Sequence, residues 1–155
     1  MADQLTEFLQ HRASRTAVSS PDWEGRKADW LRSINHLFTY IKQLLHTAIE
    51  SKAVVVQESL EEITEEEVGT YQIPVLTLWV GNEKVVFQPK GVNVIGASGR
   101  VDLQGASGAL TIIRDEPAVD SDWSIIFYRV PRLVTEKLHQ HSLRTALERV
   151  MLPLS

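Results

Sequence analysis

The strongest periodic pattern in the chain runs from Trp30 to Ile49, where apolar residues recur at spacings of three and four. Three of them fall in each heptad, as in the series Trp30, Leu37 and Leu44. The stripe is wider than the seam of a two-stranded coiled coil and is typical of a helix that packs across a sheet or between partners. Just before it, the sequence Ser-Pro-Asp at 20–22 supplies a capping hydroxyl, a proline suited to the first turn and an acid for the positive end of the helix dipole. We predict one long helix over residues 21–51.

A different period begins after residue 51. In IPVLTLWV (residues 73–80) apolar residues alternate with others, and a turn containing glycine separates this run from KVVFQP (residues 84–89). Further short apolar runs follow, with glycine-rich turns between them. We predict an antiparallel meander of about five or six strands over residues 53–130. Because the runs at 112–113 and 125–127 are apolar on both faces, we expect the central strands to be covered on both sides.

An acidic stretch with six glutamates lies between Glu58 and Glu67. Repulsion between these carboxylates disfavours a packed core position. We interpret the stretch as a strand that runs out into an acidic, solvated loop, and a short helix is the alternative.

The ends of the chain are expected to be helical. Residues 1–20 form a short helix and a polar linker in this interpretation, with Leu5, Phe8 and Leu9 on one helix face. A last helix is expected over residues 132–152, beginning near Thr135 and Glu136. The order of helices, strands and helix predicts a single α+β domain over residues 1–155.

The glycine-containing segment VIGASG (residues 94–99) raises the question of phosphate binding. A dinucleotide-binding turn needs the spacing G-x-G-x-x-G and a following helix, whereas here an alternating strand-like run follows from Arg100. The phosphate-loop pattern fails as well, because Ala97 stands where the lysine is required. We therefore favour a hairpin turn over a phosphate cradle.

Three charged residues near this turn are candidates for a ligand site. Arg100 and Asp102 share one face of a strand, opposite Val101. A surface pair of this kind is usually structural. In the alternative, Arg100, Asp102 and Arg114 would line a pocket of a small-ligand or nucleotide-handling enzyme near residues 91–102.

Trp79 is the best candidate for an interface. It stands between Leu78 and Val80 in its strand, so it faces away from them. Such an aromatic is either covered by a helix or offered to a partner. Packing under the long helix is the favoured interpretation and a protein interface is the alternative.

No metal or cofactor site is predicted. Glu136 and His139 match the E-x-x-H pattern of di-iron proteins, but those sites need two such motifs and two further glutamates. An exposed helix face is the better interpretation. The chain has no cysteine, which excludes thiolate zinc sites and disulfides.

Charge and composition narrow the function further. A net charge of −4 argues against a nucleic-acid binder, and no apolar run is long enough to span a membrane. The N-terminus lacks the basic and apolar regions of a secretory signal, so we expect a cytoplasmic, bacterial protein. No catalytic residue can be assigned. We favour a non-enzymatic adaptor or inhibitor-type protein that acts through protein–protein contacts, with a homodimer formed through surplus apolar helix surface.

Overall fold

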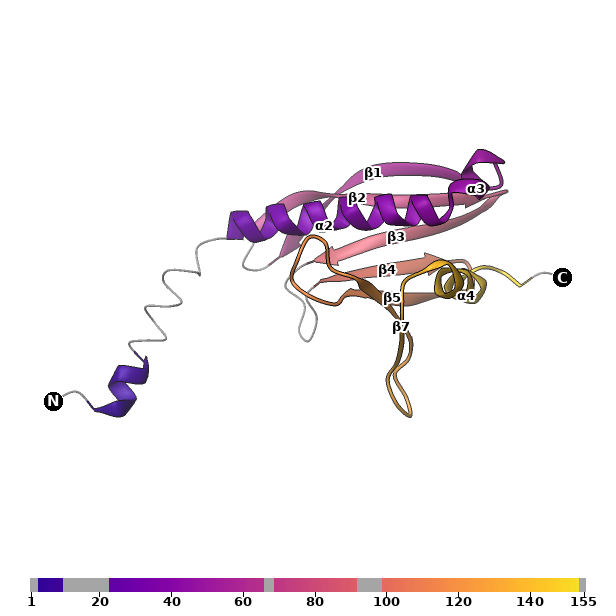
Figure 1. Ribbon diagram of the computed structural model, residues 1–155. Helices are drawn as coiled ribbons and strands as arrows, with labels where there is room; N and C mark the ends of the chain where they lie inside the picture. Colours follow the sequence, from indigo (N-terminus) through magenta and orange to yellow (C-terminus); the bar gives the residue numbers. More distant parts are fainter. Residues whose placement is uncertain (1–2, 10–22, 66–68, 92–98, 154–155) are drawn as a thin grey trace.

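A computed structural model describes residues 3–9, 23–65, 69–91 and 99–153 of the protein (Figure 1). Its centre is a seven-stranded sheet in which the strands follow the order of the chain and every neighbouring pair is antiparallel. The strands are β1 (Val55–Glu65), β2 (Gly69–Val80), β3 (Glu83–Gly91), β4 (Arg100–Gly105), β5 (Gly108–Arg114), β6 (Trp123–Tyr128) and β7 (Val134–Lys137). The α+β class and the antiparallel meander are confirmed.

The predicted long helix is also confirmed, with one interruption. It consists of α2 (Trp23–Leu44) and a short α3 (His46–Glu50), and Leu45 lies between them. The C-terminal helix α4 covers Gln140–Val150, and residues 4–9 form a separate short helix. α2 lies along β2, and α4 lies across β4, β5 and β6 on the same side of the sheet (Figure 1).

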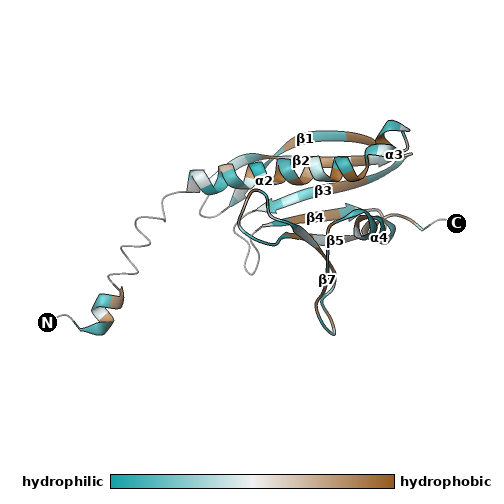
Figure 2. Ribbon diagram, viewed as in Figure 1, coloured by the Kyte–Doolittle hydropathy of each residue, from teal (hydrophilic) through white to brown (hydrophobic). Residues whose placement is uncertain are grey.

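One hydrophobic core fills the space between these helices and the sheet. The brown, hydrophobic stretches of α2 and of the strands in Figure 2 belong to this layer. From α2 it receives Trp30, Ile34, Leu37, Phe38 and Ile41, each at most 1% exposed. At roughly 1.5–3 kcal/mol for each large side chain, this burial is the main force that holds α2 on the sheet. The apolar stripe is thus covered within one chain over most of its length.

The sequence predicts that the central strands are covered on both faces. The described helices do not provide this cover on the second face. Both α2 and α4 lie on one face. On the other face Ile113 is half-buried and Thr135 is exposed, whereas Ile126 is only 7% exposed. The helices of the described ranges therefore cover one face of the sheet.

β1 extends further than expected. The acidic stretch does not leave the sheet at Glu58, because β1 pairs with β2 continuously from Val55 to Glu65. Hydrogen bonding to β2 keeps the strand extended, and its glutamates reach water because β1 is an edge strand. Residues 66–68 lie outside the described part of the chain.

The C-terminal helix starts later than expected. Residues 134–137 form β7, which pairs with β6, and the helix begins at Gln140. His139 caps it: Nδ1 of His139 accepts the Ser142 N–H at 3.3 Å, and Ser142 Oγ accepts the His139 N–H at 2.9 Å. Glu136 and His139 therefore lie on a strand and at a cap, so they share no helix face.

Gly99 has a packing role in the glycine-containing segment. A strand, β4, follows it, as expected of a hairpin; residues 92–98 lie outside the described part of the chain. Gly99 has a φ of +148°, and a Cβ there would lie 2.2 Å from Cζ3 of Trp30. The absence of a side chain lets the indole of Trp30 lie against the start of β4.

Candidate docking groove

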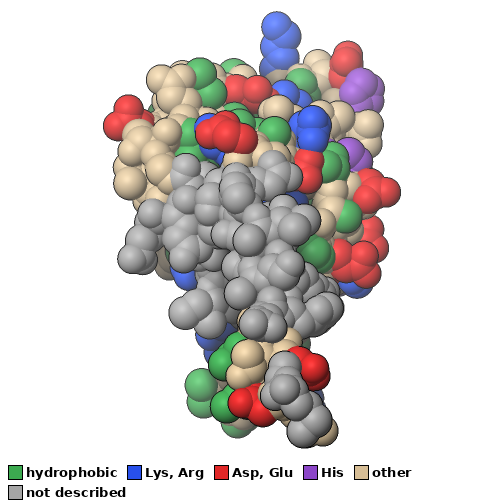
Figure 3. All heavy atoms as spheres, turned by 90° about the vertical axis from the view of Figure 1, so that its left-hand side faces the viewer, with side chains coloured by type: hydrophobic (Ala, Val, Ile, Leu, Met, Phe, Trp, Pro, Cys, Tyr) green, Lys and Arg blue, Asp and Glu red, His purple; other side chains and the backbone are tan. Residues whose placement is uncertain are grey.

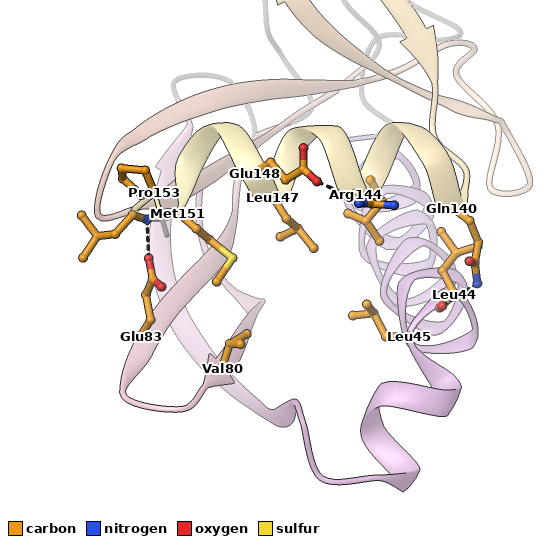
Figure 4. Close-up of a pocket in the computed structure, with 12 residues that line it drawn as sticks. Leu44, Leu45, Val80, Glu83, Gln140, Arg144, Leu147, Glu148, Met151 and Pro153 are labelled. Atoms are coloured by element: carbon orange, nitrogen blue, oxygen red, sulfur yellow. Dashed lines mark hydrogen bonds and ion pairs between the residues drawn. The ribbon is translucent and has the colours of Figure 1, made fainter. Parts of the chain in front are cut away.

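A groove of about 720 Å³ opens where α2 and α3 diverge from α4 (Figure 4). One wall is the end of α2, another is α4 with the residues after it, and the third is the turn between β2 and β3. We call this cavity the interhelical groove; it is lined by Leu44, Leu45, Val80, Glu83, Gln140, Leu143, Arg144, Leu147, Glu148, Met151, Leu152 and Pro153.

The apolar lining comes from side chains that the core covers only partly. Leu44, Leu45, Val80, Leu147 and Met151 are half-buried and pack against the core. In Figure 4, Leu147 of α4 and Met151, which follows α4, point toward Leu45 and Val80. The groove is thus a continuation of the core that is open to solvent.

Hydrogen bonds hold the walls of the groove at both ends of α4. Gln140 Nε2 donates to the carbonyl of Leu44 at 2.8 Å, which links the start of α4 to the end of α2. At the other end, the N–H of Leu152 donates to Glu83 Oε1 at 2.6 Å, which links the chain after α4 to β3. Walls fixed in this way lower the ordering cost of binding.

The charged side chains that line the groove are Glu83, which accepts the N–H of Leu152, and the pair Arg144 and Glu148. Arg144 and Glu148 are one helical turn apart, with a distance of 3.0 Å between Nε and Oε1, and both are exposed. Such a surface pair contributes about 0.3–0.5 kcal/mol to stability. No cluster of three or more His, Cys, Asp or Glu able to hold a metal occurs in the described residues. The lining fits apolar side chains, and the rim can orient them.

Arg100 and Asp102 come together as expected. The Nε of Arg100 lies 2.7 Å from Oδ1 of Asp102, and a second contact of 3.2 Å makes the pair bidentate. The hydrogen bond to Asp102 raises the pKa of Arg100. Asp102 is 9% exposed, and the pair lies on the sheet face that α2 and α4 do not cover.

Arg114 lies on the opposite face of the sheet from this pair. Arg100 pairs across strands with Ile113, so the next residue along β5 projects toward the helices. There Arg114 is 4% exposed, its Nη1 donates to Ser33 Oγ at 2.7 Å, and its guanidinium lies 5.1 Å from the ring centre of Trp30. Burial lowers its pKa. The three charged candidates therefore do not line one pocket.

Trp79 is not packed under the long helix. It alternates with the core residue Leu78 and therefore faces the other side of the sheet. Its Nε1 donates to Gln57 Oε1 at 3.2 Å, and Nζ of Lys84 lies 5.9 Å from its ring centre. Helix cover was the wrong interpretation, and an interface role for this half-buried indole stays a prediction.

A smaller cavity of about 340 Å³ contains more polar residues but offers little free chemistry. Its lining includes His36, Tyr40, Lys137 and His139. Tyr40 donates to the carbonyl of Leu138 at 2.9 Å, Lys137 pairs with Asp115, and His139 caps α4. These side chains hold β7 and α4 in place.

Sequence reasoning did not identify the interhelical groove. The periodicity places Leu44 in the apolar stripe of the long helix, and it does not distinguish a core position from the wall of a groove. The available signal was the width of the apolar stripe, since Leu44 and Leu45 extend it beyond the part that the sheet covers.

Comparisons with family models, with curated proteins and with solved structures found no match. None of the helices in the described ranges is long and apolar enough to cross a membrane. The end of the molecule in Figure 3 shows acidic and basic side chains interspersed, without a large basic patch among the coloured residues.

Proposed function

We propose that this protein is a non-enzymatic interaction module that binds an amphipathic helix of a protein partner in the interhelical groove. The observation that carries the proposal is the groove itself, a mainly apolar cavity whose walls are fixed by hydrogen bonds and whose charged lining residues, Glu83, Arg144 and Glu148, each have a partner. Helix-in-groove recognition uses apolar side chains at i, i+3 or i+4, and i+7 as anchors. Leu45 on one wall and Leu147 and Met151 on the other would receive such anchors.

The expected affinity follows from the area that remains to be covered. Completing the burial of four half-buried side chains (Leu44, Leu45, Leu147 and Met151) contributes about 1 kcal/mol each, and the partner's anchors contribute a similar amount. Association costs at least about 4 kcal/mol. The difference of at most about 4 kcal/mol corresponds to a dissociation constant of about millimolar or weaker, which is that of a transient complex.

The groove also changes the basis of the expected homodimer. The α2 stripe from Trp30 to Ile41 is buried within one chain, so it leaves no surplus surface for a subunit there. In the described residues, the groove is a place where apolar helix side chains such as Leu44 and Leu147 remain half-buried. We retain as proposals that the protein forms a homodimer and that it is cytoplasmic.

A synthetic amphipathic helix of 14 residues, with leucines at i, i+3, i+4 and i+7 and a fluorescent label, tests the proposal. Fluorescence anisotropy measures its binding to the full chain. Leu147→Glu places a charge among apolar side chains and should weaken binding more than about ten-fold. Leu133→Glu is the matched control, because Leu133 is 60% exposed and lies outside the groove.

Circular dichroism melts show whether each variant is folded, and Leu45→Asn provides a milder second variant on the opposite wall. Binding that is equally strong in the native protein and in both groove variants would disprove the proposal. So would the absence of binding, up to millimolar protein, in both the full chain and a chain that lacks residues 1–12.

A further inference from the structure

We infer that the chain's own N-terminal helical segment, residues 3–9, binds in the interhelical groove of the same molecule and competes there with the partner helix. The inference rests on the proposed function, since it names a second ligand for the same groove. Three observations support it: the segment is amphipathic, the lining of the groove is mainly apolar, and the chain between them is long enough to connect them.

The segment is amphipathic. Leu5 and Leu9 lie one helical turn apart, are 67% and 53% exposed, and share a face with Phe8. Glu7 lies on the opposite side of the helix, at about 200° from Leu5 when each residue turns by about 100°, and Asp3 precedes the helix. When the leucines enter an apolar groove, both carboxylates remain in water.

The short helix depends on outside contacts for its stability. It covers residues 4–9, and the Thr6 N–H donates to Oδ1 of Asp3 at 2.6 Å as an N-terminal cap. Isolated helices shorter than about 12 residues are marginal in water even in favourable sequences. A helix of this length with exposed leucines therefore gains order by packing its apolar face against another surface.

The groove offers the complementary surface. Its half-buried side chains Leu45, Val80, Leu147 and Met151 come from facing walls, so a single turn of helix can contact both. Leu5 and Leu9 would provide two anchors of the i, i+4 kind. A partner helix with three or four anchors would bind more tightly and displace the segment.

The connecting chain is long enough for binding within one molecule. α2 has 22 residues, so its start and its end at the groove are about 32 Å apart. Residues 10–22 can span at most about 43 Å. A tethered segment that reaches its site has an effective concentration on the order of millimolar. At micromolar protein, the segment of the same chain therefore outcompetes that of a second copy.

Removal of residues 1–12 tests the inference with the same labelled 14-residue helix. At a millimolar effective concentration and a millimolar dissociation constant of the segment, the truncated chain should bind this probe about two-fold more tightly than the full chain, because the tethered competitor is gone. Leu5→Glu with Leu9→Glu in the full chain should reproduce the gain, and Glu7→Gln, on the polar side, is the matched control. A peptide of residues 1–12 should compete with the probe for the truncated chain.

The outcomes separate this inference from the proposed function. Equal probe affinity of the full and truncated chains, with Leu147→Glu still weakening both, overturns the inference and leaves the groove function intact. Light scattering measures the mass in solution and tests whether the segment binds the groove of a second copy. A full chain that is a dimer and becomes a monomer on truncation would show binding between two copies, and it would overturn binding within one molecule.

Discussion

Replacing Gly99 with alanine should destabilise the protein strongly, although the change adds a single methyl group. Two independent costs arise at this position. The φ of +148° is a conformation that residues with a side chain rarely adopt, and the new Cβ would lie 2.2 Å from Cζ3 and 2.7 Å from Cη2 of Trp30. Trp30 is fully buried, with Trp123 at 6.0 Å between ring centres and Arg114 at 5.1 Å, so it has no open side toward which to move.

The magnitude follows from these two terms. A strained backbone conformation costs on the order of 1–3 kcal/mol, and overpacking a core typically costs another 1–3 kcal/mol. The sum of roughly 2–6 kcal/mol is a large part of the 5–15 kcal/mol that separates folded and unfolded states in typical domains. At about 2–4 °C per kcal/mol for a chain of this size, Tm should fall by roughly 5–20 °C.

Urea unfolding followed by tryptophan fluorescence measures the loss. Gly108→Ala is the matched control, because the nearest atom to a Cβ there is 4.0 Å away and its φ lies outside the left-handed region. If the contact with Trp30 causes the loss, combining Gly99→Ala with Trp30→Phe should cost at least about 1 kcal/mol less than the sum of the single changes. Equal stability of the Gly99→Ala and Gly108→Ala variants would refute the reasoning.

Two further outcomes follow from buried polar groups. Burial, and then the neighbouring Glu65, raise the pKa of Tyr71, so the folded protein keeps a phenol proton that the unfolded chain loses near pH 10. The contribution of Tyr71 to the free energy of unfolding is therefore complete below about pH 10 and falls above it. The urea midpoint of the native protein should fall between pH 8 and pH 11, and Tyr71→Phe should reduce this fall. Identical falls in the two proteins would contradict the prediction. Ser142→Ala should cost about 1–3 kcal/mol in urea unfolding, because Ser142 is buried, accepts the His139 N–H and donates to the Lys137 carbonyl at 2.6 Å. The exposed Thr47→Ala is its control, and equal losses would argue against the cap.

The features that the sequence predicted correctly depend on local periodicity. The heptad spacing of Trp30, Leu37 and Leu44 needs no knowledge of the remaining chain to indicate a helix with a buried stripe. The two-residue period of a strand likewise places Arg100 and Asp102 on one face, where they form an ion pair. Each periodic pattern extends over enough residues to predict the secondary structure, whatever the helix or strand propensity of single residues.

The features that it missed depend on register and tertiary packing. Thr135 to Lys137 is compatible with either a strand or a helix, and only its pairing with β6 makes it β7. The position of Arg114 opposite the Arg100–Asp102 pair depends on the β4–β5 register. Strand alternation separates Trp79 from Leu78, but it does not identify which face the helices cover. The groove arises because Leu45 and Leu147, a hundred residues apart in the chain, lie on diverging walls.

The acidic edge strand β1 bears on whether copies of this protein can associate through their sheets. An edge of 11 residues presents unpaired backbone groups that can template growth of the sheet onto a neighbouring molecule. Glu58, Glu61 and Glu62 are exposed along it, and a second copy aligned on the same edge would bring its own carboxylates against them. Charge repulsion thus protects the longest free edge from fibril-like stacking, and acid strong enough to neutralise the carboxylates would remove that protection.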